Sequence, residues 1–82
     1  MTPFKVLLNS PDLITRFVSI IMYFPFDVDL HPENNNRTTV DAKSVVGVFS
    51  LDVSKPLVMI VHTTEVSDLL QIKDRLSDFL VN

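Results

Sequence analysis

His31 and His62 are the side chains of this 82-residue chain best suited to acid–base, metal or phosphoryl chemistry. Neither has a second histidine or a carboxylate beside it at a metal-ligand spacing. Asp27 and Asp29 alternate with apolar residues, as solvated charges do on the outer side of a half-buried strand. We therefore expect hydrogen-bonded or surface histidines, solvated aspartates, and no bound metal or cofactor.

The chain lacks the sequence motifs of nucleotide binding and of nucleophilic catalysis. Gly47 is its single glycine, so a glycine-rich phosphate loop is excluded. None of the serines stands in a nucleophile-elbow pattern or beside a base in the sequence. There is no cysteine, which excludes a disulfide framework and a thiolate metal site. The sequence therefore predicts a protein that is not an enzyme.

Composition favours one packed domain over residues 1–82, since 46% of the residues are hydrophobic and 21% are charged. Ten acidic against seven basic side chains give a net charge of −3, which disfavours nucleic acid as a partner. The longest apolar stretch, residues 17–26, is far shorter than the roughly 20 residues of a membrane-spanning helix, so we expect no membrane insertion. No secretory signal is visible, and we expect a cytoplasmic location.

Hydrophobic periodicity predicts the elements of the first half. Alternation of apolar residues over 4–8 and over 26–30 indicates two half-buried strands. Between them, five apolar residues recur at helical spacing: Leu13, Phe17, Ile20, Ile21 and Phe24. They predict a helix that starts after Pro11-Asp12 and is stopped by Pro25. The asparagine-rich stretch 32–36 is typical of a turn, and Thr38–Val40 of a short strand that completes a hairpin.

The second half predicts a short helix around residues 45–49, a central strand over 57–63 and a C-terminal amphipathic helix. The apolar stripe of that last helix has five members: Leu69, Ile72, Leu76, Phe79 and Leu80. The element order is therefore βαββαβα. Such an order predicts the α+β class, a two-layer sandwich with helices covering one face of a sheet.

The segment Val40–Leu51, with the sequence VDAKSVVGVFSL, resembles the most characteristic stretch of the phosphocarrier protein HPr family of the bacterial sugar phosphotransferase system. The element order, the length and the lack of cysteine also suit that family, so the resemblance spans essentially the whole chain. It implies an open-faced two-layer sandwich with a four-stranded antiparallel sheet and three helices on one face. It also implies a role connected with sugar transport.

In that family a histidine at the start of the first helix, within Gly-Ile-His-Ala-Arg-Pro, accepts phosphate from enzyme I and passes it to a sugar permease. The aligned segment here is residues 12–17, which retains the arginine as Arg16 and so implies phosphate binding there. Ile14 occupies the phosphoacceptor position, and its hydrocarbon side chain cannot attack phosphorus. We therefore expect no phosphohistidine at this site, and a binding or regulatory module. The alternative is a working phosphocarrier whose acceptor is another residue, with His31 and His62 as the candidates.

The second family site is better preserved. A serine that opens the second helix is phosphorylated by a regulatory kinase in some Gram-positive bacteria, and Ser44 matches it; the simpler alternative is that Ser44 only caps the helix. Val45, Val46 and Phe49 match the apolar patch through which family members bind partners. Val18 and Met22 lie off the core stripe of the first helix and are expected to extend that patch.

A third alternative comes from alternation in the predicted central strand. If Met59 and Val61 face the helices, Val58 and Ile60 face outward, together with Leu7 of the neighbouring first strand. An uncovered sheet face with these aliphatic side chains favours a self-associating structural domain, such as a homodimer. Ordinary surface aliphatic residues are the competing explanation.

Overall fold

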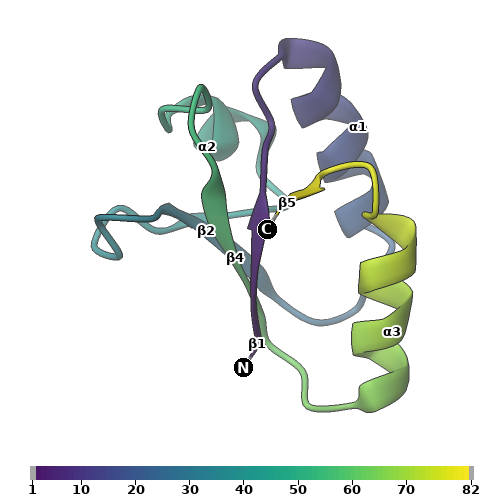
Figure 1. Cartoon of the computed structure of the whole chain (residues 1–82). Coiled ribbons are helices and arrows are strands. Elements are labelled where there is room, and N and C mark those ends of the chain that lie inside the picture. Colours follow the sequence, from purple (N-terminus) through teal and green to yellow (C-terminus); the bar gives the residue numbers. More distant parts are fainter. Residues whose placement is uncertain (1, 82) are drawn as a thin grey trace.

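The computed structural model describes residues 2–81, which form five strands and three helices (Figure 1). In chain order they are β1 (Thr2–Val6), α1 (Pro11–Ile21), β2 (Val28–Pro32), β3 (Val40–Asp41), α2 (Val45–Phe49), β4 (Leu57–Val61), α3 (Val66–Arg75) and β5 (Leu80–Val81). The predicted α+β class and the order of the first seven elements are confirmed. The structure adds β5, which the sequence analysis assigned to the last helix.

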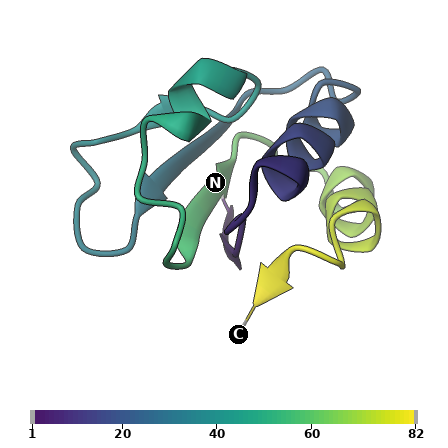
Figure 2. The ribbon, with the colours of Figure 1, turned by 90° about the horizontal axis from the view of Figure 1, so that it is seen from above.

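The strands form one antiparallel sheet with the order β3-β2-β4-β1-β5. The three helices lie on the same side of this sheet, and its other face is uncovered (Figure 2). The expected count of four strands is wrong because α3 ends at Arg75 and the chain then turns back along β1. The amide of Leu7 donates to the carbonyl of Phe79 at 2.9 Å, and Leu80 pairs with Val6.

Strand β4 is the central strand that the sequence predicts. It pairs with β1 on one side and with β2 on the other. Its residues alternate between the two faces: Leu57, Met59 and Val61 are fully buried beneath the helices, whereas Val58 and Ile60 are partly exposed on the uncovered face. The structure therefore meets the condition under which Val58 and Ile60 were expected to face outward.

Helix α1 begins with Ser10 as its N-cap, whose hydroxyl accepts a hydrogen bond from the amide of Leu13 at 3.2 Å, and with Pro11 in the first turn. Its buried face consists of Ile14, Phe17, Val18 and Ile21. The expected stripe was therefore displaced, and Val18, expected at the surface, is 2% exposed. The buried face is this wide because α1 packs on the sheet while α2 and α3 flank it (Figure 2).

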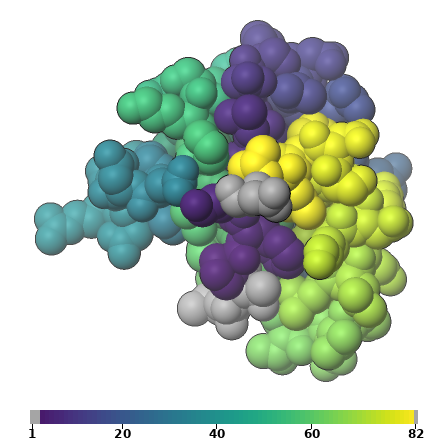
Figure 3. All heavy atoms as spheres, viewed as in Figure 1, coloured from purple at the N-terminus to yellow at the C-terminus, as the bar shows by residue number. Residues whose placement is uncertain are grey.

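The hydrophobic core lies between the sheet and the helices. Phe17 of α1 and Phe79 meet edge to face, with ring centroids 5.7 Å apart. The loop between β2 and β3, by contrast, projects from the body of the molecule (Figure 3), and the predicted strand Thr38–Val40 is reduced to Val40 and Asp41. Within residues 2–81 no helix has the length and apolar character needed to cross a membrane.

Candidate functional site

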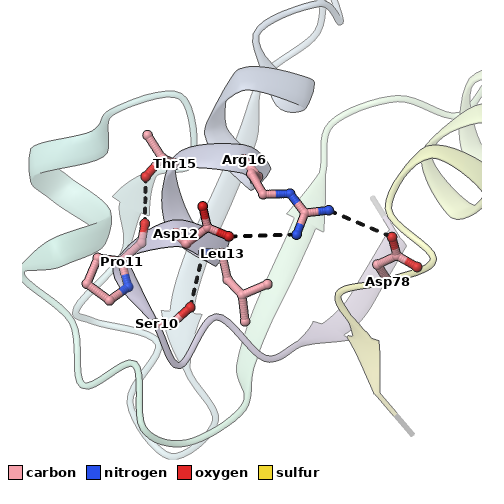
Figure 4. A network of polar contacts seen from close by, with 7 residues as sticks. All are labelled: Ser10, Pro11, Asp12, Leu13, Thr15, Arg16 and Asp78. Carbon is pink, nitrogen blue, oxygen red and sulfur yellow. Dashed lines mark hydrogen bonds and ion pairs between the residues drawn. The ribbon is translucent and has the colours of Figure 1, made fainter.

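The start of α1 is the place where the family resemblance puts phosphate chemistry. Arg16 there contacts two carboxylates, Asp12 at 3.8 Å and Asp78 at 4.0 Å, and its guanidinium lies 5.7 Å from the centre of the Phe79 ring (Figure 4). All three charged side chains are more than half exposed, so these are surface ion pairs of small energy. They nevertheless place two negative charges where a phosphate would have to approach Arg16.

Ile14 does not lie at the solvent-facing start of this helix. Its side chain is fully buried in the core, and its amide donates to the carbonyl of the N-cap residue Ser10 at 3.1 Å. The motif alignment put Ile14 at the helix start, but Ser10 and Pro11 hold that place in the structure. The alignment missed this because a motif match does not report helix register, and the stripe predicted from periodicity also left Ile14 out of the core. Position 14 therefore offers no side chain to a phosphoryl donor.

Ser44 is the N-cap of α2. Its hydroxyl accepts a hydrogen bond from the amide of Gly47 at 3.1 Å, which satisfies one of the free amides at the helix start. A Cβ on Gly47 would lie 3.3 Å from this hydroxyl oxygen and 3.4 Å from the Cβ of Val40. Glycine therefore allows the short helix to pack closely here. The capping role that the sequence suggested for Ser44 is confirmed.

Exposed apolar side chains lie on α2 and at the C-terminal end of α1, and these two helices pack against each other. We call them together the α1–α2 surface; its members are Met22 (63% exposed), Val45 (38%), Val46 (82%) and Phe49 (47%). Of the two residues expected to extend the patch on α2, Val18 is buried, whereas Met22 is exposed at the end of α1. Lys43 fixes the two helices here, because its ammonium donates to the carbonyl of Phe24, just beyond α1, at 2.7 Å.

The polar flank of α1 separates this surface from α3. Thr15 and Arg16 point to opposite sides of the helix, Thr15 toward α2 and Arg16 toward Asp78 (Figure 4). On the α3 side, Arg75 lies over the ring of Tyr23 at 5.6 Å. The α1–α2 surface therefore has no free basic side chain from α1 on its border, since the only basic residue of that helix turns away from it.

The two histidines lie away from α1: His31 is on β2, and His62 directly follows the last residue of β4. His62 Nε2 donates to Asp29 Oδ2 at 2.7 Å, and both side chains are about one-third exposed. His31 Nδ1 donates to the carbonyl of Pro32 at 2.6 Å. The expectation of hydrogen-bonded histidines is thus met. Asp29, expected to be solvated, is instead paired with His62.

The sequence analysis missed the Asp29–His62 pair because 33 residues separate its members. The pairing of β2 with β4 brings them together, since Asp29 lies opposite Ile60, two residues before His62. Asp27 takes no part in the Asp29–His62 hydrogen bond. Within residues 2–81 no group of three or more side chains is placed to bind a metal ion. The pair is a hydrogen-bonded contact and lacks the additional ligands that a metal ion would need.

A shallow cleft separates the β2–β3 loop from the loop that precedes β4. Its lining includes Glu33, Asn35, Asp52 and Lys55. Asp52 accepts hydrogen bonds from the hydroxyl of Ser54 at 2.6 Å and from its amide at 3.2 Å, and these bonds lower the pKa of the Asp52 carboxyl. The carboxylate therefore serves a local turn, and the cleft brings no second reactive group to it.

Comparison with known proteins shows a fold rather than a family. No family model matches the chain, and no curated protein matches it significantly. Among solved structures it is similar to the crystal structure of HPr-C-His from Thermoanaerobacter tengcongensis, with a TM-score of 0.70 and 18% sequence identity. The similarity covers 95% of this chain and 92% of that one, so the chain has an HPr-like fold.

We predict that introducing the missing imidazole by Ile14→His does not create an acceptor. A histidine at this fully buried position loses apolar packing and buries a polar ring, which should lower the free energy of unfolding by about 2–5 kcal/mol. Urea denaturation measures the change. Thr15→His, one residue along on the exposed side, is the control and should cost no more than about 1 kcal/mol. Equal stability of the two variants would contradict the buried placement of Ile14.

Proposed function

We propose that this protein is a non-enzymatic binding or regulatory module, related to the HPr proteins of the sugar phosphotransferase system, that docks partners through the α1–α2 surface and carries no phosphohistidine at α1. The observation that carries this proposal is the exposure of Val45, Val46 and Phe49 on α2, which packs against α1, a helix whose start has no imidazole. A surface of this kind can bind a protein without any chemistry of its own.

The energetics of the α1–α2 surface support docking. Burying a valine, methionine or phenylalanine side chain contributes about 1.5–3 kcal/mol. Val46 is 82% exposed on a helix of only five residues, so most of this contribution is unused within the domain. Single exposed apolar residues are common in proteins, but three of the five residues of α2 are exposed and apolar, which is the kind of concentration that partners cover.

The charges around α1 argue against the transfer of a phosphoryl group through this helix. The first turn carries Asp12, the last turn has no basic residue, and Arg16 already contacts two carboxylates. A phosphoryl donor would approach a helix start that carries an exposed carboxylate and no imidazole. Binding at the neighbouring apolar surface needs none of these groups.

A phosphocarrier that uses His62 is a second candidate, favoured by the Asp29–His62 contact. When Nε2 carries the proton donated to Asp29, the lone pair of the ring lies on Nδ1, which is the form able to attack phosphorus. Against it, Asp41 lies directly opposite Asp29 in the sheet and adds a second negative charge. His31 has no carboxylate partner that would orient its ring in this way.

A transfer assay separates the two candidates. We expect no label in the wild-type protein when it is incubated with enzyme I and radioactive phosphoenolpyruvate, because no accessible imidazole lies at α1. An ordinary HPr in the same mixture shows that enzyme I is active. Acid-labile label that is present in the wild type and in His31→Ala, but absent from His62→Ala, would refute the proposal of a binding module and support a phosphocarrier that uses His62.

Docking is tested by titrating isotopically labelled protein with the domains of the phosphotransferase system that bind HPr, and following amide chemical shifts. We expect the perturbed residues to cluster on Val45, Val46 and Phe49, and Val46→Asp to weaken binding at least about tenfold by placing a charge in the contact. Leu70→Asp, on an exposed site of α3, is the matched control and should bind as the wild type does. Perturbations centred on α3 would refute the α1–α2 surface.

We also propose that Ser44 is a phosphorylation site that regulates this docking. A phosphate on its oxygen adds negative charge at the start of α2, where helix amides favour it, next to Val45 and Val46. A kinase that acts on HPr serines should label the wild type and not Ser44→Ala. Ser50→Ala, a serine at the other end of α2, should be labelled as the wild type is, and equal labelling of all three proteins would exclude Ser44.

A further inference from the structure

The uncovered face of the sheet has an arrangement that neither the fold nor the α1–α2 surface requires. Register places Val58 and Ile60 of β4 at its centre, because β4 is the middle strand of the five. Val58 lies between Lys5 of β1 and His31 of β2 in one row across the sheet. Ile60 lies between Pro3 and Asp29 in the next row. The apolar centre thus has polar residues beside both rows on the β2 side, and Lys5 beside the Val58 row on the β1 side.

Leu7, expected on this face, lies beyond the end of β1, so Lys5 is the residue opposite Val58. The ammonium of Lys5 contacts the carboxylate of Glu33 at 3.0 Å. Glu33 follows the end of β2, so this ion pair reaches across β4 from one neighbouring strand to the other. Both side chains remain more than 40% exposed, so water and other charges can reach them.

The edges of the sheet are poorly suited to adding another strand. The outer strands β3 and β5 have two residues each. The rest of the β1 edge, beyond the pairing with β5, includes Pro3, which has no amide hydrogen. The amide of Leu7 points toward the β5 side of β1, and successive amides along a strand point to opposite sides. The nitrogen of Pro3 therefore faces this same side, so the open edge lacks a hydrogen-bond donor at position 3. Association through this sheet therefore has to use its face.

We propose that the uncovered face is the interface of a homodimer, in which two copies pack sheet on sheet about a twofold axis parallel to β4. This axis places β4 on β4 and β1 of one copy over β2 of the other, so Val58 and Ile60 meet their counterparts at the centre. Lys5 of each copy then faces the His31–Glu33 end of β2 in its partner. The two Lys5–Glu33 pairs, one within each chain, are then exchanged for two such pairs between the chains.

Charge complementarity makes a second copy the occupant of this face. A twofold interface brings each surface patch against itself, so it is stable only when the patch is self-complementary. Here one strand beside the apolar centre carries Lys5 and the other leads to Glu33, and the proposed axis superimposes these two sides. Sheets that pack face to face lie about 10 Å apart, a gap that a lysine and a glutamate side chain can bridge.

The dimer is expected to be weak. The molecule measures 30 × 25 × 23 Å, so the face is smaller than 30 × 25 Å and falls below the about 800 Å² per partner of a standard stable interface. Its apolar centre is also limited to two partly exposed side chains. Association should therefore become visible only at high protein concentration, on the order of 100 μM.

Sedimentation equilibrium of the full chain over a concentration series tests the interface. The wild-type average mass should rise from 9.3 kDa toward twice that value as concentration increases. Ile60→Lys should stay monomeric, and Leu70→Lys, at an exposed site on α3, should associate as the wild type does. Circular dichroism checks that each variant is folded. A wild type that stays monomeric up to about 1 mM, or an Ile60→Lys protein that still dimerises, would overturn the proposal.

The proposed axis is tested by exchanging charges between chains. Lys5→Glu and Glu33→Lys, studied separately, should each raise the dimer Kd about tenfold or more, because each homodimer then juxtaposes like charges. An equimolar mixture of the two variants should associate again, since opposite charges now meet between chains although neither chain can form the pair internally. A mixture no more associated than its components would rule out this arrangement. Partner binding at the α1–α2 surface is on the other side of the sheet and is unaffected by either result.

Discussion

Burial of one face of β4 is the constraint on which the rest of this structure depends. Leu57, Met59 and Val61 have no exposed surface, and β1 and β2 flank them as direct hydrogen-bonded neighbours. A domain of 82 residues has a single core, so all three helices must cover that same face. The opposite face remains uncovered for the same reason, because no further element is available among the described residues to pack on it.

The helices show how this constraint shapes the candidate site. α1 fills the space above the sheet and must bury Ile14, Phe17, Val18 and Ile21 on its inner side. This requirement removes position 14 from solvent and turns Thr15 and Arg16 outward. α2 is too short to bury more than Val48 among its five residues, so Val45, Val46 and Phe49 remain at the surface. The α1–α2 surface thus follows from helix length as well as from residue type.

The sequence predicts those parts of the fold that depend on periodicity, and it fails where two strands must be brought together. Alternation over residues 4–8 and 26–30 predicts β1 and β2, because a half-buried strand leaves a period of two residues in the sequence. β5 was missed because the apolar residues Leu76, Phe79 and Leu80 fit helical spacing, whereas their burial comes from the turn after α3 and from pairing with β1. The Asp29–His62 contact depends on the register of β2 with β4, which no local pattern reveals.

The treatment of Ile14 shows how motif alignment and core packing can disagree. Alignment to a six-residue motif preserved Arg16 but placed a core residue at a site where the family has a reactive side chain. Helix register is set by about 1.5–3 kcal/mol for each large apolar side chain buried, whereas an exposed arginine paired with carboxylates contributes little. The buried residues therefore determine which way α1 faces. The chain and the solved HPr structure share a fold at 18% identity, so core packing can specify the shape of the domain without specifying the residues exposed at the start of α1. A surface that needs only exposed apolar side chains depends less on those residues than a reactive site would.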